Sequence, residues 1–204
     1  MNSSTADTQQ WGINVRIVHL ILACTVTFQL FSSLCMADPG IQFLFPIHEF
    51  IGLVTAGCVL AFWWLSIANH DLRILLPWNR AGVSAILHDI GGLLHGRLPV
   101  TGKQLGLSGF VHGLGLLALT GSSITGFIIY FYVPMAGHVN PADSASFTRW
   151  SLDHKFFGEL LWIYWFGHVG FAILHQILGK NIIQGIFNLN TPADTSDHPH
   201  KSKR

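Results

Sequence analysis

Two observations, the composition and the number of long apolar segments, predict that this chain is an all-α integral membrane protein, a bundle of four transmembrane helices. Half of its 204 residues are hydrophobic and only 10% are charged, whereas about a quarter of the residues in ordinary soluble domains are charged. Four apolar segments are long enough to cross a bilayer, which needs roughly 20 mostly apolar residues. Histidines lie in or at the ends of all four segments, and ionisable groups inside a membrane are functional candidates because they are costly there.

The charge distribution predicts the orientation of the bundle. The net charge is +1, so charge gives no indication of a nucleic-acid partner. If the N-terminus lies on the inner side, nine of the eleven Lys and Arg residues fall in inner segments, and only Arg149 and Lys155 fall in outer ones. The positive-inside rule therefore predicts a multi-pass protein of the bacterial inner membrane with both termini cytoplasmic.

The cysteines argue against a disulfide framework, a zinc site and a covalently bound haem, and the N-terminus argues against a cleavable signal peptide. The three cysteines, Cys24, Cys35 and Cys58, show no CxxC pairing, so we interpret them as small core residues. There is no CxxCH motif, so a haem would be bound non-covalently, as in b-type cytochromes. We expect no cleavable signal peptide, because the first fifteen residues are mostly polar and contain no Lys or Arg.

The first two helices are predicted to be antiparallel neighbours. Residues 1–10 are polar and are expected to form a disordered tail. The first helix is predicted over residues 17–36, with His19 near its start. A short turn rich in Pro and Gly follows, and the second helix is predicted over residues 48–68, opened by His48.

A long inner loop precedes the second pair of helices. Residues 81–96 have apolar side chains at helical spacing but are too short and too polar to span a bilayer, so we predict an amphipathic helix on the inner membrane surface. The third helix is predicted over residues 108–133 and is rich in glycine, which allows close helix packing. The fourth helix is predicted over residues 155–178. Residues 191–204 are expected to be a disordered tail.

The histidines of the fourth segment indicate haem ligation. His154 and His168 are fourteen residues apart, which is four helical turns less about 40° and a rise of about 21 Å, so both imidazoles face nearly the same way. Two imidazoles on one face at different depths suit the axial positions of two haems. His175 lies seven residues beyond His168 and is again nearly in register.

Pairing by depth assigns partners to these ligands. A b-type haem iron without an open position needs two imidazoles from opposite sides. Because helix directions alternate, His48 and His154 both lie at the outer mouth and form one pair. His19 lies near the inner face, and its partner is either His168 or His175. Depth favours His175 slightly and small neighbouring residues favour His168, so spacing leaves this choice open.

Two further residues have alternative interpretations. His112 lies near the inner mouth of the third helix, where it is a candidate to line a quinone pocket, to bond a haem propionate, or simply to lie at the interface. Arg16 is placed either to meet the propionates of the inner haem or to act as a positive-inside anchor. A lone histidine would more often be hydrogen-bonded in a bundle core, but two in register with depth-matched partners favour haem over packing.

Several motifs carry a resemblance over residues 11–188. They are Arg16-Ile-Val-His19, Pro46-Ile-His48, Thr120-Gly121 through Gly126, and Arg149-Trp-Ser-Leu-Asp-His154 followed at +14 by Gly167-His168. The chain resembles the bacterial cytochrome b561 and Ni-Fe hydrogenase cytochrome b family, which is related to formate dehydrogenase membrane subunits. The resemblance implies that His19 pairs with His168 and His48 with His154, and that His175 lies near the inner haem, beside a quinone. Leu20 departs from the Trp that often follows the first ligand in this family.

The implied function is electron transfer by a dihaem cytochrome b. Two haem b groups would carry electrons between the quinone pool and a redox partner of a respiratory chain, either a cytochrome c, a hydrogenase or a dehydrogenase. Whether the chain is an enzyme by itself, its electron donor and its oligomeric state are left open. One alternative is a stand-alone superoxide:quinone oxidoreductase, which needs a cationic outer funnel, whereas only Arg149 and Lys155 are available. Another is a histidine-relay transporter, although no internal repeat is evident.

Overall fold

The chain folds into helices throughout the part that the structure describes. The structure is a computed structural model, and it describes residues 12–36, 39–41, 43–99, 103–132 and 143–178. Four helices are long and apolar enough to cross a membrane. They are α1 (Ile13–Cys35), α2 (Leu44–Ala68), α5 (Leu107–Tyr132) and α6 (Ser144–Ile177). The shorter elements are η1 (Pro39–Ile41), α3 (Leu72–Leu75) and α4 (Arg80–Leu94).

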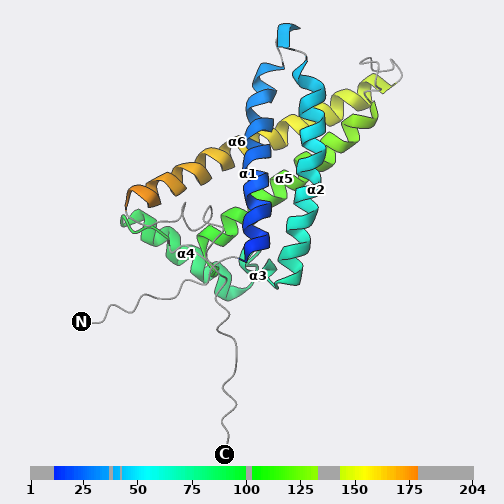
Figure 1. The fold of residues 1–204 in the computed structure, drawn as a ribbon. Helices are drawn as coiled ribbons and strands as arrows, with labels where there is room; N and C mark the ends of the chain where they lie inside the picture. The colour runs from blue at the N-terminus through cyan, green and yellow to red at the C-terminus, as the bar shows by residue number, and fades with distance from the viewer. Residues whose placement is uncertain (1–11, 37–38, 42, 100–102, 133–142, 179–204) are drawn as a thin grey trace, which may run out of the picture.

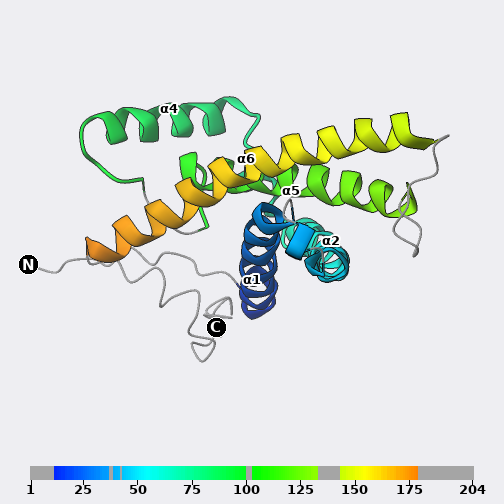
Figure 2. The ribbon, with the colours of Figure 1, turned by 90° about the horizontal axis from the view of Figure 1, so that it is seen from above.

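The long helices form two antiparallel hairpins. Helix α1 packs along α2 and helix α5 packs along α6, while α2 and α5 connect the two hairpins. Figure 2 shows that the α5–α6 pair crosses the α1–α2 pair obliquely, so that α1 and α6 have few contacts with each other. Helices α3 and α4 lie at the end of the bundle where α1 begins and α2 ends (Figure 1).

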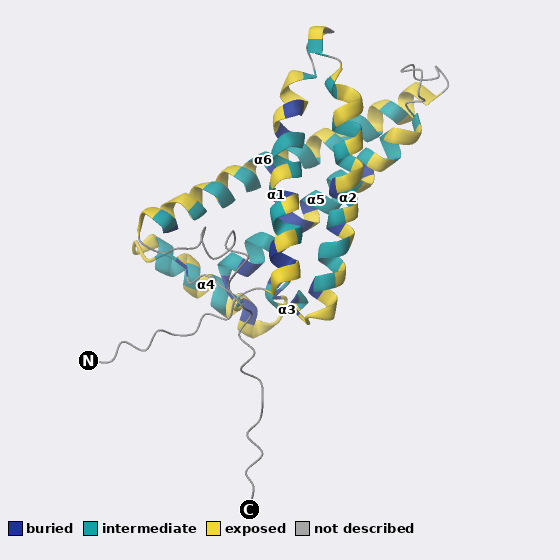
Figure 3. Cartoon of the chain, in the orientation of Figure 1, coloured by how far each residue is buried: buried dark blue, intermediate teal, exposed yellow. Residues whose placement is uncertain are grey.

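The outer surface of the bundle is largely apolar. Large hydrophobic side chains such as Phe50, Leu60, Trp64 and Ile163 are exposed, and exposed positions follow the outward faces of the long helices (Figure 3). Soluble monomers rarely expose so much contiguous apolar surface. This distribution is expected where lipid is the solvent, because lipid tails solvate apolar side chains as well as a core does.

Glycines in α5 allow the close approach of its neighbours. A Cβ atom added at Gly113 would lie 2.8 Å from the carbonyl carbon of Leu75 in α3. A Cβ added at Gly121 would lie 2.7 Å from Cδ1 of Phe157 in α6. Both distances are well below ordinary carbon–carbon contact of about 3.5–4 Å, so the packing of α3 and α6 on α5 requires these small residues.

Helix α6 begins earlier than the apolar pattern predicts. It starts at Ser144 and has 34 residues, whereas the sequence places its start at about 155. At 1.5 Å per residue it is about 51 Å long, which exceeds the roughly 30 Å hydrocarbon core of a bilayer. Its polar first turns therefore extend beyond the span. The predicted tails, residues 1–10 and 191–204, lie outside the described residues.

The three cysteines are free and differ in burial. Cys58 is partly buried and packs against the cluster of Leu22, Val59 and other core residues. Cys24 and Cys35 are exposed, so their interpretation as core residues is wrong. Both lie on the outward side of α1, where a small side chain meets the surroundings of the bundle rather than a neighbouring helix.

Candidate functional site

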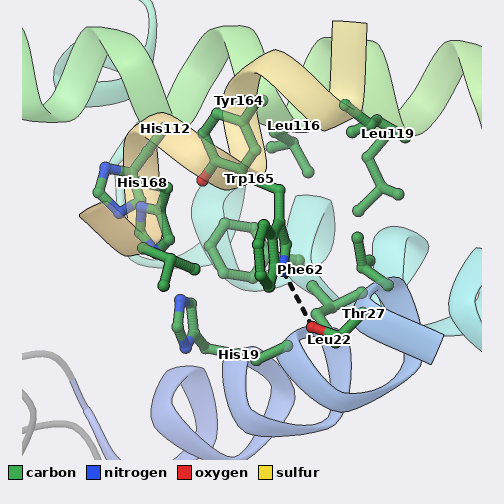
Figure 4. Close-up of a pocket in the computed structure, with 15 residues that line it drawn as sticks. His19, Leu22, Thr27, Phe62, His112, Leu116, Leu119, Tyr164, Trp165 and His168 are labelled. Atoms are coloured by element: carbon green, nitrogen blue, oxygen red, sulfur yellow. Dashed lines mark hydrogen bonds between the residues drawn. The ribbon is translucent and has the colours of Figure 1, made fainter. Parts of the chain in front are cut away.

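A cavity lies where α1 and α6 diverge, at the end of the bundle that the charge distribution predicts to be the inner one, and it is named the inner cavity accordingly. Residues of all four long helices line it, and they border about 820 Å³ of empty space, which includes space open to the outside. The lining is mostly apolar, and its polar groups include three imidazoles (Figure 4). This combination of a mostly apolar wall and a few convergent polar groups is typical of a cofactor site.

His19 and His168 face each other across this cavity. Their ring centroids are 6.0 Å apart and their planes are inclined at 55°. Metal–imidazole bonds of about 2 Å on each side, plus roughly 1 Å from each nitrogen to its ring centre, separate two axial imidazole centroids by about 6 Å. The observed separation therefore fits one iron between the two rings. His175 is buried two turns further along α6 and does not line the cavity.

His112 brings a third imidazole into the same cavity. Its ring centroid lies 4.8 Å from that of His168, edge to face. Its Nδ1 lies 2.7 Å from the Ser108 carbonyl oxygen, and because a carbonyl can only accept, Nδ1 carries the hydrogen and Nε2 has a free lone pair. Tyr164 stacks on the other side of His168, with ring centroids 5.3 Å apart. His112 thus lines the same cavity as His19 and His168.

At the outer end of the bundle, His48 is held by α1. Its Nδ1 lies 2.9 Å from the Ser32 hydroxyl, and that hydroxyl donates to the Gln29 carbonyl at 3.2 Å. If Nε2 of His48 binds a metal, Nδ1 carries the hydrogen and donates it to the Ser32 oxygen, and the Ser32 hydroxyl then donates to the Gln29 carbonyl. The Gln29 side-chain amide also donates to the His48 carbonyl at 2.7 Å, so both the ring and the backbone of His48 are fixed.

His154 is held in the same way by α5. Its Nδ1 lies 3.0 Å from the Ser122 carbonyl and 3.1 Å from the Thr125 hydroxyl, so Nδ1 donates and Nε2 is available to a metal. Gly126 leaves room beside this ring, since an added Cβ would lie 3.0 Å from its Cε1. His48 and His154 are also close enough to interact electrostatically. The structure therefore brings together the two predicted outer histidines.

Sequence reasoning missed the residues that hold these imidazoles. Ser32 lies outside the motifs, and Ser122 and Thr125 lie within the Thr120–Gly126 motif without a role that the sequence assigns to them. A hydroxyl on an apolar helix usually bonds its own helix backbone, and Ser122 acts through its backbone carbonyl. These residues become identifiable only when the register between neighbouring helices is known. A histidine with a serine or threonine at a similar depth on the adjacent helix is the only sequence signal that could have indicated them.

The inner end also contains charged groups. Arg16 is only 3% exposed and lies one turn before His19 on α1. Asp71 is 2% exposed and pairs with Lys103, with an N–O distance of 2.7 Å. This ion pair, for which the sequence carries no signal, connects α3 to the segment that leads into α5.

The donor set suits a haem rather than a bare metal ion. Within the described ranges, no three His, Cys, Asp or Glu side chains form a group that could hold a metal ion by themselves. A haem iron needs only two axial protein ligands, because the macrocycle supplies the others. Two opposed imidazoles at the inner cavity, and two imidazoles with available Nε2 atoms at the outer end, fit that requirement.

Comparison with known proteins supports the same class. A family model described as prokaryotic cytochrome b561 matches residues 10–188. This range contains all four long helices and the histidines of both sites. No curated protein and no solved structure matches the chain.

Proposed function

The chain belongs to the prokaryotic cytochrome b561 family, and on this premise we propose that it carries two haem b groups and exchanges electrons with membrane quinone. A transmembrane b-type cytochrome in electron transfer is what the family implies. The observation that carries the finer proposal is the opposition of His19 and His168 at 6.0 Å across a cavity lined by all four spans. The redox partner is a cytochrome c, a hydrogenase or a dehydrogenase of a respiratory chain.

In this proposal four histidines would hold the two haems, two histidines to each haem. His19 and His168 hold the inner haem, and His48 and His154 hold the outer one. Each haem, when bound, supplies an iron that takes up and gives back one electron. The apolar walls of the bundle exclude water and lower the local dielectric, and thereby influence the reduction potential. Arg16, buried one turn before His19, is proposed to meet the propionates of the inner haem.

His112 is the proposed contact for quinone. Two of the three imidazoles of the inner cavity suffice for one iron, which leaves His112 for another role. With its Nδ1–H donated to Ser108, its Nε2 can accept a hydrogen bond from a quinol hydroxyl. His175, buried further along α6, is proposed to stand beside the same quinone rather than to bind iron.

The proposed orientation has both termini in the cytoplasm of a bacterium, with α4 on the inner membrane surface. Apolar side chains of α4 are exposed, among them Val83, Leu87 and Leu94, the last at 83%. An amphipathic helix buries such a stripe at the boundary between headgroups and acyl chains. A superoxide:quinone oxidoreductase ranks second as a function, because Glu49 and Asp153 adjoin the outer ligands and oppose a cationic entrance for superoxide.

The haem content of purified variants tests this proposal. We expect a reducible b-type visible band and two haems per chain in the wild type. His154→Ala and His168→Ala should each leave one haem, whereas His175→Ala should keep both. The absence of any b-type band would refute the cytochrome proposal, and loss of a haem in His175→Ala but not in His168→Ala would refute the inner pairing.

A further inference from the structure

The four proposed ligands differ in how the protein holds them. The outer pair is hydrogen-bonded on the nitrogen that would face away from iron, His48 by Ser32 at 2.9 Å and His154 by the Ser122 carbonyl at 3.0 Å. Across the residues that the structure describes, neither His19 nor His168 has a hydrogen-bonded ring nitrogen, and His19 Nδ1 is buried without a partner. The two sites are therefore unequal in the hydrogen bonding of their ligands.

This difference has a predictable effect on iron. When an imidazole donates its N–H to an oxygen, electron density on the ring increases and the other nitrogen becomes a stronger ligand. Stronger axial donors stabilise ferric iron relative to ferrous iron and lower the reduction potential. Hydrogen bonding thus favours a lower potential at the outer site, whichever nitrogen of His19 or His168 binds iron.

Neighbouring charges also favour a lower reduction potential at the outer site. Glu49 directly follows His48, and Asp153 directly precedes His154, both partly buried. Lys155, which follows His154, is exposed, and an exposed charge is more strongly screened by solvent. The net charge beside the outer ligands is therefore negative.

We propose that Ser32, Thr125 and the Ser122 carbonyl are positioning groups that keep the reduction potential of the outer haem below that of the inner haem. This inference rests on the proposed function, and it gives the direction of electron flow, from the outer haem to the inner haem. With both haems bound, a lower outer potential would favour transfer of one electron from the outer site to the inner site, so that the outer haem would be oxidised and the inner haem reduced. The outer face would then receive electrons from a one-electron donor, and the inner cavity would deliver them to quinone.

The structure also ranks the contributions of the two hydroxyls. His48 Nδ1 has only the Ser32 hydroxyl within the described part of the chain, so Ser32→Ala removes its acceptor completely. His154 keeps the Ser122 carbonyl when Thr125 is replaced by valine. Ser32→Ala should therefore shift the outer potential upward by more than Thr125→Val does.

Potentiometry of the purified full-length protein, followed by its visible spectrum, measures this effect. We expect two components in the wild type, with the lower one absent from His154→Ala. That lower component should move upward in Ser32→Ala and less in Thr125→Val, while the ferric low-spin EPR signal of the outer haem changes. Ser33→Ala is the matched control, because among the described residues the Ser33 hydroxyl bonds only the Leu30 carbonyl of its own helix, at 2.7 Å.

Each outcome decides a separate question. If no haem is bound, the proposed function and this inference both fall. If two haems are bound but the component lost in His154→Ala is the higher one, the inference falls and the function stands. It falls equally if Ser33→Ala shifts the lower component as much as Ser32→Ala does. Should Ser32→Ala not fold, an unchanged lower component in Thr125→Val overturns the inference.

Discussion

Gly115 links the packing of α5 against α6 to the position of His168, a proposed ligand of the inner haem. It lies on α5 and lines the inner cavity, where the Tyr164 ring packs directly over it. Tyr164 in turn stacks on His168, with ring centroids 5.3 Å apart and planes inclined at 19°. A side chain at position 115 would therefore displace His168 through Tyr164, without touching any proposed ligand of the outer site.

The size of the effect follows from the distances. A Cβ added at Gly115 would lie 2.7 Å from Cδ2 of Tyr164, and closer still to Cε2 and Cζ. Ordinary carbon–carbon contacts are about 3.5–4 Å, so the tyrosine ring must move by about 1 Å. Overpacking of this kind costs about 1–3 kcal/mol, which corresponds to a roughly 5- to 150-fold weaker occupancy of the inner site if the strain is relieved by displacing His168.

Haem content and potentiometry of Gly115→Ala test this expectation. We expect loss or perturbation of the inner haem, with the outer haem unchanged. Gly57→Ala is the control, because Gly57 is exposed on α2 and an added Cβ meets nothing within 4 Å. Full occupancy of both haems with unchanged potentials in Gly115→Ala would show that the stack of Tyr164 on His168 does not hold the ligand.

Three further predictions concern other contacts. Gly126→Ala should perturb only the outer haem and cost about 1 kcal/mol, because an added Cβ lies 3.0 Å from His154 Cε1; EPR of the ferric protein checks this. Lys103→Ala should lower the free energy of unfolding in detergent by about 3–5 kcal/mol, because it removes the ion-pair partner of the Asp71 carboxylate, which is only 2% exposed. Asp71→Ala should cost less, because the Lys103 side chain is 21% exposed and can be hydrated. Thermal unfolding measures both effects. Asp89→Ala removes the acceptor of the first N–H of α5 at 2.8 Å and should cost about 0.5–2 kcal/mol in the same thermal assay.

The features of the fold that could be predicted from the sequence are those that depend on composition and on the helical period. Long apolar runs predict four spans because each exceeds the roughly 20 residues that a bilayer requires. The 3.6-residue period places His154 and His168 on one face, since that relation lies within a single helix. The glycines of the third span predict close packing, which Gly113 and Gly121 show against α3 and α6.

Most features that could not be predicted from the sequence depend on how neighbouring helices pack against one another. The start of α6 at Ser144 lies in a polar stretch without an apolar stripe, so period and hydropathy gave no signal there. The opposition of His19 to His168 rather than to His175 depends on how α1 crosses α6, which depth counting does not determine. The contact between His112 and His168 is of the same kind.

The hairpin arrangement explains why the two sites are held differently. His48 and Ser32 lie near the closed end of the α1–α2 hairpin, where the helices run side by side and a hydroxyl of one reaches the imidazole of the other. His154 and Thr125 have the same relation in the α5–α6 hairpin. The inner imidazoles, His19 and His168, instead come from different hairpins and meet where α1 and α6 diverge. Close packing supplies hydrogen-bond acceptors at the outer end, and divergence supplies space at the inner end, so one topology produces both a tightly held site and an open cavity.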